Sequence, residues 1–212
     1  MQNLIDTPVS RRGLLGAGIL GGGVALMSGG RAMAASLGEP ALQPEVRSRA
    51  LAAMSRHISR IKFRDVIGIA DFDAASSTPR FHLLDVGSGQ VTSLLVAHGR
   101  GSDPSHTGWL QRFSNELGSA ASCSGAFVTS EEYVGNHGRS RRIDGLDSTN
   151  SNARDRAVVI HGAWYVSSQM IRDHGKLGRS EGCFAFSEQD LVQVMARLGA
   201  GRLIYSDKID RA

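Results

Sequence analysis

The sequence predicts one mainly β domain with flanking helices. Short runs of β-branched and aromatic residues, separated by segments rich in Gly, Ser and Asn, follow one another from residue 66 onward. One segment with helical periodicity precedes these runs, and another lies near the C-terminus. The chain has 212 residues and a hydrophobic content of 41%, which is enough for a single globular domain with a buried core.

The N-terminus has the features of an export signal. The motif Ser10-Arg11-Arg12-Gly13 precedes a glycine-rich apolar run, and Ala32-Met33-Ala34 has the small residues of a signal peptidase site. The apolar run spans about 14 residues, fewer than the roughly 20 that cross a bilayer as a helix. We expect residues 1–34 to be a twin-arginine signal peptide, removed after Ala34, so that the mature protein enters the periplasm or cell envelope without stable membrane insertion. An uncleaved anchor is the alternative.

The formal net charge of +4 does not predict a nucleic-acid partner. The predicted leader holds Arg11, Arg12 and Arg31 against Asp6, so about half of the net charge is lost with it. The remaining sequence has no basic stripe interleaved with aromatic residues. We therefore expect no binding to nucleic acid.

Helix signals occur at both ends of the predicted domain. Residues 35–44, rich in Ala, Ser, Gly and Pro, predict a linker, and residues 45–212 the folded domain. A helix is predicted over residues 45–61, where apolar side chains recur at helical spacing. Another is predicted to begin at Ser187, in a capping pattern, and to end at Gly199. The apolar positions of these two helices are Val46, Ala50, Leu51, Met54, Ile58, Leu191, Val192, Met195 and Leu198.

The strand candidates share a high content of β-branched and aromatic residues. They cover residues 66–72, 80–85, 90–97, 127–129, 157–161 and 202–205. The Gly87-Ser88-Gly89 turn between the second and third candidates predicts a β-hairpin. The long segments between the later candidates are rich in Gly, Ser and Asn and predict loops.

Two short motifs carry residues suited to nucleophilic catalysis. Ser180-Glu181-Gly182-Cys183 contains a thiol, and His161-Gly162, at the end of a predicted strand, contains an imidazole. An imidazole close to a thiol can take its proton and produce the nucleophilic thiolate. Because Gly182 has no side chain, amides around Gly182 and Cys183 can approach a substrate and are candidate donors to an oxyanion. The residues alone leave a structural disulfide between Cys123 and Cys183 as an alternative.

The arrangement of these motifs resembles the active-site region of the L,D-transpeptidase catalytic domain family, often called YkuD-like. The shared pattern is a histidine-glycine pair at the end of an apolar strand, followed after a variable segment by Ser-x-Gly-Cys. Further matches indicate a divergent murein branch of the family and extend the similarity to residues 45–205. These matches are Val96-Ala97-His98-Gly99, Phe113-Ser114-Asn115, Ser122-Cys123-Ser124-Gly125-Ala126-Phe127 and Tyr133-Val134-Gly135-Asn136-His137-Gly138.

The resemblance implies the L,D-transpeptidase fold, of β-sandwich or barrel-like form, and a two-step acyl transfer on the peptide stems of peptidoglycan. Cys183 would attack the carbonyl of the L-centre of a diamino acid in a tetrapeptide stem and release the terminal D-alanine. His161 would be the base, oriented by the carbonyl of Gly162, while Ser180 and Gly182 would shape the pocket. An amine from a neighbouring stem would give a 3-3 cross-link, and water a trimmed tripeptide. No cofactor and no metal are implied.

The sequence departs from better-known family members beside the cysteine. Those members have an aliphatic residue and then an arginine after the Gly-Cys pair, whereas here Phe184 and Ala185 follow Cys183. The usual cationic contact next to the cysteine is therefore missing. Arg179, or Arg141 and Arg142 in a predicted loop, are candidates to bind a carboxylate instead, with a solvated surface role as the alternative.

Two further departures concern charge and length. Glu181 stands where many relatives have a basic residue or histidine, and an acid there disfavours a lone thiolate. The interval between His161 and Cys183 is a few residues longer than usual. The additional residues, 164–176, predict a short helix capped near Gly175, and its neighbours Trp164 and Tyr165 are candidates to stack on substrate or to pack in the core.

The other histidines and the second cysteine have alternative roles. His98 and His137 each precede a glycine and are expected either to line the site or to be structural. A zinc site built from these two histidines with His161 and Cys183 is disfavoured, because no closely spaced ligand pair supports it. Cys123 is expected to be a buried thiol that packs as a small apolar group.

Three other functions remain open at this point. An L,D-carboxypeptidase or endopeptidase would hydrolyse the same type of bond, and the choice depends on whether the groove admits an amine or only water. A non-catalytic peptidoglycan-binding protein would keep the fold without needing a thiol beside an imidazole. A redox protein would require Cys123 and Cys183 to be adjacent.

Overall fold

A computed structural model of the chain describes residues 42–209. The predicted signal peptide, residues 1–34, and most of the predicted linker, residues 35–44, lie outside the described residues, so the export signal stays a prediction. The described residues belong to one compact unit. Within them, no helix combines the length and the apolar character needed to cross a membrane.

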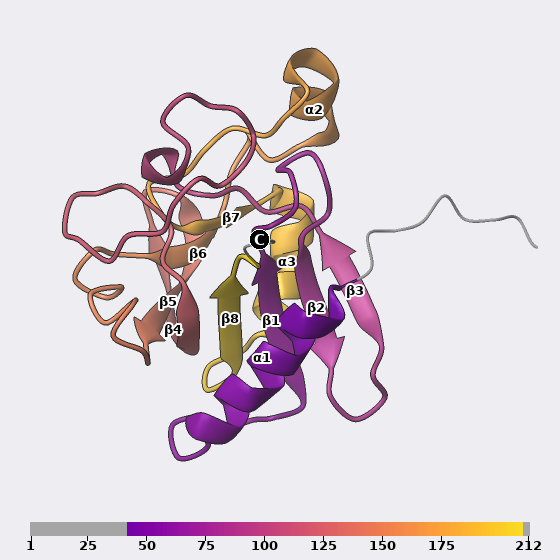
Figure 1. Ribbon diagram of the computed structural model, residues 1–212, viewed down its shortest axis with the longest axis vertical. Helices are drawn as coiled ribbons and strands as arrows, with labels where there is room; N and C mark the ends of the chain where they lie inside the picture. The colour runs from indigo at the N-terminus through magenta and orange to yellow at the C-terminus, as the bar shows by residue number, and fades with distance from the viewer. Residues whose placement is uncertain (1–41, 210–212) are drawn as a thin grey trace, which may run out of the picture. The chain divides into compact units, whose positions relative to one another are not determined.

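Eight strands form one mixed sheet in the order β3-β2-β1-β8-β4-β5-β6-β7 (Figure 1). The strands are β1 Val66–Asp71, β2 Phe81–Asp85, β3 Val91–Leu94, β4 Gly125–Gly135, β5 Gly138–Gly145, β6 Val159–Gly162, β7 Phe184–Phe186 and β8 Leu203–Asp207. The β1–β8 and β6–β7 pairs are parallel, and the others are antiparallel. The predicted mainly β class with flanking helices is confirmed.

The sheet is open, which corrects the expected sandwich or barrel-like form. Its ends nevertheless curl toward each other, because the ring of Phe81 on β2 packs against Phe186 on the edge strand β7 with centroids 4.8 Å apart. One isolated bridge joins Ala97, after β3, to Ala185 on β7. A closed barrel needs a continuous ladder between its first and last strands. A single bridge does not supply one.

The α-helices on the two faces of the sheet are α1 Pro44–Arg56 and α3 Glu188–Arg197. In Figure 1, α1 lies in front of β1 and β8, and α3 lies behind the sheet. The helix α1 buries Val46 and Ala50 against the sheet, and α3 buries Leu191 and Val194 in the larger core on the other face. These two layers hold the curled sheet in place through apolar burial.

The predicted helix boundaries agree at α3 and differ at α1. Ser187 caps α3, since its side chain accepts a hydrogen bond of 3.0 Å from the Asp190 amide. The helix α1 ends at Arg56 rather than at residue 61. The chain turns there toward β1, and the amides of Lys62 and Phe63 donate to the carbonyl of Gly201 instead of continuing the helix.

The predicted β2–β3 hairpin is confirmed, but a second hairpin occupies a region predicted as loop. Strand β4 continues to Gly135, and β5 returns from Gly138. Polar residues obscure this hairpin in the sequence because its stability comes from cross-strand charge pairs rather than apolar alternation. Glu132 lies opposite Arg141 in the register, and their side chains form an ion pair of 3.0 Å.

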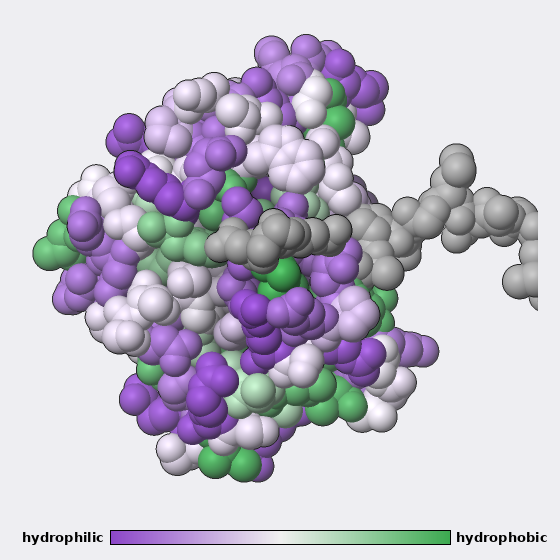
Figure 2. Space-filling view, in the orientation of Figure 1, coloured by the Kyte–Doolittle hydropathy of each residue, from purple (hydrophilic) through white to green (hydrophobic). Residues whose placement is uncertain are grey.

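The surface of the described residues is largely hydrophilic on the face visible in Figure 2, with small, separate apolar patches. Most large apolar side chains lie in the core clusters on either side of the sheet. The remaining helices are the 3₁₀ helix η1 Arg100–Ser102 and the short α2 Ser168–His174. The prediction of a short helix before Gly175 is confirmed, since Gly175 ends α2 in the left-handed conformation with φ of 71°.

Candidate active site

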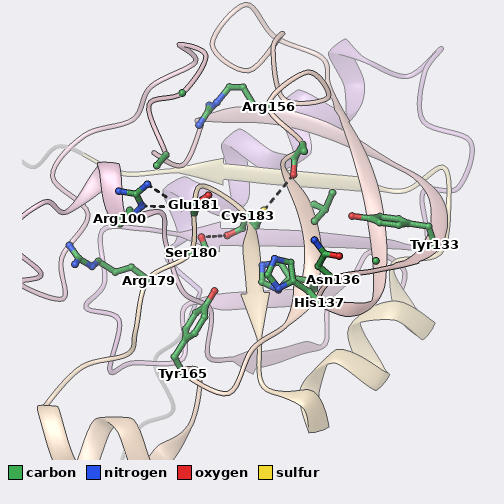
Figure 3. A pocket seen from close by; sticks show the side chains of 16 residues that line it. Arg100, Tyr133, Asn136, His137, Arg156, Tyr165, Arg179, Ser180, Glu181 and Cys183 are labelled. Atoms are coloured by element: carbon green, nitrogen blue, oxygen red, sulfur yellow. Dashed lines mark hydrogen bonds and ion pairs between the residues drawn. The ribbon is translucent and has the colours of Figure 1, made fainter.

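Strands β6 and β7 bring the two predicted catalytic side chains to one cavity. The strands are parallel neighbours, and His161 on β6 lies opposite Ala185 on β7. Cys183 directly precedes β7, and the segment that contains α2 makes the crossover that a parallel pair requires. His161 and Cys183 both line a cavity of about 680 Å³ (Figure 3).

The imidazole of His161 is buried and held in one tautomer. Its Nδ1 lies 2.8 Å from the carbonyl oxygen of Gly162. Because a carbonyl only accepts, Nδ1 carries the proton, and Nε2 of the neutral ring is free to accept one. Burial lowers the pKa of His161, and the nearby His137 lowers it further, while the Gly162 carbonyl acts in the opposite direction. The imidazole of His161 is therefore neutral near pH 7.

The ring of His137 stacks on that of His161. Their centroids are 4.3 Å apart, and the rings are inclined by 23°. His137 lies at the tip of the β4–β5 hairpin, where Gly138 takes a φ of +71° that lets the chain reverse. The hairpin therefore brings an exposed histidine over the buried one. Of the two alternatives for His137, lining the site or a structural role, the structure agrees with the first, because His137 lines the cavity.

Cys183 is half-buried and is a protonated thiol in the resting protein. Its Sγ lies 3.6 Å from the carbonyl oxygen of Ala157. Burial raises the pKa of Cys183 to about 11, and Glu181 raises it as well, whereas the Val159 amide and Arg156 lower it. Burial is the largest of these effects, so the acid at position 181 is a minor cause of the high pKa.

Ser180 and Gly182 shape the turn that presents Cys183. Gly182 has a φ of +112°, and a Cβ there would lie 2.6 Å from the carbonyl oxygen of Ala121, so only glycine fits without strain. Ser180 Oγ donates to the carbonyl oxygen of Cys183 at 2.8 Å and accepts from the Gly182 amide at 3.2 Å. The Gly182 amide is thus engaged within the motif in this structure, and its role as an oxyanion donor stays a prediction.

His98 is a structural histidine outside the cavity, which corrects its alternative placement in the site. Its Nδ1 accepts from Arg80 at 2.7 Å, and its Nε2 donates to Asp103 at 3.3 Å. Burial and the charge of Arg80 lower the pKa of His98 to about 3. Both ring nitrogens are used to join two buried charged groups, so His98 has no contact to offer a substrate.

Three arginines and one glutamate line the cavity, and sequence reasoning identified only one of the arginines. Arg179 lines the cavity and donates to backbone oxygens of Asp103 and Pro104. Arg156 and Arg100 were missed because neither belongs to one of the motifs, although Arg100, which begins η1, directly follows Val96-Ala97-His98-Gly99. Only the tertiary fold brings them beside the cysteine.

Arg156 is bonded to the segment between β3 and β4, residues 95–124. Its Nη1 donates to the carbonyl of Ser114 at 2.7 Å and lies 2.6 Å from Cys123 Sγ, and its Nη2 donates to the carbonyl of Ala121. Cys123 is buried as predicted, but with this polar partner rather than purely as an apolar group. Both Cys123 and Cys183 are free thiols, so the disulfide interpretation is wrong for this structure.

Arg141 and Arg142 lie on strand β5 and not in a loop, which corrects their predicted placement. Arg141 pairs with Glu132 at 3.0 Å, and Arg142 pairs with Glu131 at 3.2 Å. Neither arginine lines the cavity. Their charges support the β4–β5 hairpin.

Two tyrosines line the cavity on different sides of Cys183. Tyr133, beside Asn136 and His137, lies on one side, and Tyr165 lies on another (Figure 3). Trp164 is 79% exposed and packs edge-on against Tyr165 with centroids 5.9 Å apart. The two alternatives for these residues were stacking on substrate and packing in the core. Tyr165 lines the cavity, whereas Trp164 is not among its lining residues, and stacking on substrate stays a prediction.

No curated protein matches the chain significantly. Similar solved structures include an L,D-transpeptidase from Mycobacterium smegmatis, which is 15% identical with a TM-score of 0.40. The match covers 68% of this chain and 58% of the Mycobacterium smegmatis chain. The helical cell shape determining protein Pgp2 from Campylobacter jejuni is 10% identical with a TM-score of 0.46, and the match covers 80% of this chain and 58% of the Pgp2 chain. An L,D-transpeptidase from Stackebrandtia nassauensis is 11% identical with a TM-score of 0.38, and the match covers 77% of this chain and 74% of the Stackebrandtia nassauensis chain.

The family match extends over most of the chain. Residues 38–206 match the L,D-transpeptidase catalytic domain, although the chain spans only 58% of the length of the Mycobacterium smegmatis protein. The matched residues contain α1, the sheet up to Ser206 on β8, and both motifs that line the cavity. The chain belongs to the L,D-transpeptidase catalytic domain family.

Proposed function

We propose that the protein is a peptidoglycan L,D-transpeptidase with Cys183 as nucleophile and His161 as base. The observation that supports this most is the meeting of a thiol and an oriented imidazole in one cavity, from two neighbouring parallel strands. The substrate would be the tetrapeptide stem of peptidoglycan, and no cofactor is needed for the chemistry.

In the first step the stem is transferred to the cysteine. His161 Nε2 takes the proton from Cys183 Sγ as the sulfur attacks the carbonyl carbon at the L-centre of the diamino acid. The bond between this carbon and the nitrogen of D-alanine breaks, and His161 gives the proton to the departing amine. Because the Gly182 amide is engaged with Ser180, the Cys183 amide is the candidate donor to the oxyanion.

The second step releases the stem from the thioester. An amine from a second stem attacks the carbonyl carbon, His161 takes a proton from this amine, and the C–S bond breaks. The proton returns to sulfur, and the product is a 3-3 cross-link. If water attacks instead, the product is a tripeptide, as in an L,D-carboxypeptidase.

The protonation states of the pair fit a proton transfer during attack. Burial raises the pKa of Cys183 to about 11 and lowers that of His161, so both the thiol and the imidazole are neutral in the resting protein. The thiolate then forms only when a carbonyl is in position. We further propose that residues 1–34 direct export by the twin-arginine route to the cell envelope, where such stems occur.

The test is incubation of the full chain with disaccharide-tetrapeptide, followed by mass spectrometry. Cross-linked dimers that have lost D-alanine support the transpeptidase, and tripeptide alone supports the carboxypeptidase. Cys183→Ala and His161→Ala should abolish either product, whereas the matched control Cys123→Ala should retain it. Unchanged substrate with the wild-type protein contradicts both enzymes. Cleavage of existing cross-links then tests an endopeptidase, and binding without turnover supports the peptidoglycan-binding alternative.

A further inference from the structure

A second cavity adjoins the one that contains Cys183. It has a volume of about 290 Å³, and four of its lining residues also line the larger cavity. The shared residues are Arg100, Gly118, Ala120 and Arg179. Two cations therefore stand at the junction between the catalytic cavity and its extension.

The backbone of Arg100 is fixed beside the cysteine motif. The Arg100 amide donates to the carbonyl of Ser180 at 2.7 Å, three residues before Cys183. A Cβ on the preceding Gly99 would lie 2.8 Å from the Gly182 nitrogen, so this segment packs backbone against backbone on the motif. This close packing holds the start of the Arg100 side chain at the cavity rim.

The guanidinium of Arg100 binds only one of the two carboxylate oxygens of Glu181. Nε and Nη2 donate to the same oxygen, Glu181 Oε1, at 3.2 and 3.0 Å. These two nitrogens form one edge of the guanidinium, which can bind both oxygens of a carboxylate at once. The side chains are 61% and 76% exposed, and such surface pairs contribute little to stability. A ligand carboxylate can therefore replace Glu181 at low cost.

Arg179 adds a second positive charge whose position is fixed. Its Nη1 donates to the carbonyls of Asp103 and Pro104, and the latter distance is 3.1 Å. Glu181 is the only carboxylate among the described residues that line the cavity. Figure 3 shows Arg100, Glu181 and Arg179 on one side of Cys183, away from His137. The third arginine, Arg156, is already bonded to the segment between β3 and β4.

We infer that Arg100, supported by the charge of Arg179, binds a carboxylate of the stem peptide, and that Glu181 occupies this position until the substrate arrives. The inference rests on the proposed function, since it names the part of the substrate that this end of the cavity recognises. The carboxylate is either that of the terminal D-alanine or that of an internal acidic residue of the stem.

The experiment compares three tetrapeptides with the full chain: one with all carboxylates free, one with the terminal carboxylate amidated, and one with the internal carboxylate amidated. Arg100→Met should raise KM for the free acid about tenfold, the effect of losing a charge-assisted pair. It should leave KM unchanged for whichever amidated peptide lacks the recognised group, which identifies the source. Glu181→Gln should lower KM for the free acid about threefold, because it removes a competitor whose exposed pair with Arg100 is weak.

Arg49→Met is the matched control. Arg49 is another half-exposed arginine with ion pairs, to Glu45 and Asp207, and it lies on α1 and does not line the cavity. Its substitution should leave KM unchanged, and thermal melting should be similar for both variants. Equal KM values of wild type for all three peptides, or an Arg100→Met effect that is the same for all of them, would overturn the inference.

A binding measurement separates this inference from the proposed reaction. Calorimetry with the Cys183→Ala protein reports affinity for each peptide without turnover. A preference for the free acid that Arg100→Met removes supports the subsite even if the wild-type protein forms no product. Absence of that preference overturns the subsite even if cross-links form.

Discussion

His98 and His161 both follow an apolar stretch and precede a glycine, and both are almost completely buried, with 1% and 2% exposure. Their surroundings differ. Both ring nitrogens of His98 are hydrogen-bonded, one to Arg80 and the other to Asp103. In His161, one ring nitrogen is hydrogen-bonded to the carbonyl of Gly162, and the ring lines a cavity.

The difference teaches that burial and local sequence do not make a histidine a base. A buried imidazole whose nitrogens both have partners contributes to stability, because its loss leaves buried charges unpaired. An imidazole with one fixed nitrogen and one available nitrogen contributes to chemistry. The following four changes test this division between the two histidines, in order of decreasing effect.

The largest effect is expected from His161→Asn. Loss of the base should reduce the rate of D-alanine release by about 10²- to 10⁴-fold. Stability should change little, because the asparagine amide can take the place of Nδ1 and donate to the carbonyl of Gly162. Initial rates and thermal melting measure both quantities. A variant that keeps a third of the wild-type rate would contradict the role of His161 as base.

His98→Leu should have the opposite profile. The buried guanidinium of Arg80 and the carboxylate of Asp103 each lose a partner, which should lower the free energy of unfolding by about 3 kcal/mol. Activity per folded molecule should stay within a few-fold of wild type. Urea denaturation measures the loss, and His57→Leu, which removes a partly exposed pair with Asp147, serves as a control with a smaller loss. Unchanged stability of His98→Leu would break the comparison.

The pH dependence should also separate the two histidines. The rate should fall at low pH as His161 takes up a proton, with a midpoint below 6.5 because its pKa is lowered, and stay level at higher pH until Cys183 titrates. A rate that already declines above pH 8 would indicate a thiolate-imidazolium pair instead. The unfolded chain protonates His98 near pH 6.5 but the folded chain only near 3, so its contribution to stability is lost as the pH falls through this window. His98→Leu should flatten that slope without moving the rate profile.

The smallest effect is expected at His137. His137→Ala removes the ring that stacks on His161 and should lower kcat/KM about threefold. His137→Phe keeps a ring but removes the charge that lowers the pKa of His161, so the acidic limb of the rate profile should move upward toward 6.5. A shift downward would show that His137 acts on His161 in another way.

Those parts of the fold with local signals could be predicted from the sequence. The β2–β3 hairpin follows from Gly87-Ser88-Gly89, and α3 follows from the cap at Ser187. Strands β5 and β7 could not be predicted in this way. The first is polar and depends on ion pairs with β4, and the second has only three residues whose pairing with β6 comes from the tertiary fold.

The candidate site was predictable only where a motif carried it. His161 and Cys183 belong to motifs that resemble the family, and the structure brings both to one cavity. Arg100, at the start of η1, and Arg156, in a turn, lie far from Cys183 in the sequence, so no spacing rule connects them with it. The same lack of a spacing rule prevented a choice between the two roles of His98.

The long segment between β3 and β4, residues 95–124, is attached to β7 and to the cysteine motif by two isolated bridges, those of Ala97 with Ala185 and of Gly99 with Ser180. It contributes Arg100 and Ala120 to the cavity, whereas the sheet contributes His161. Substitutions and insertions in this segment can therefore change the residues that line one side of the cavity, while His161 keeps its position on the sheet. One side of the cavity can thus be altered, in evolution or by protein engineering, without a change in the sheet.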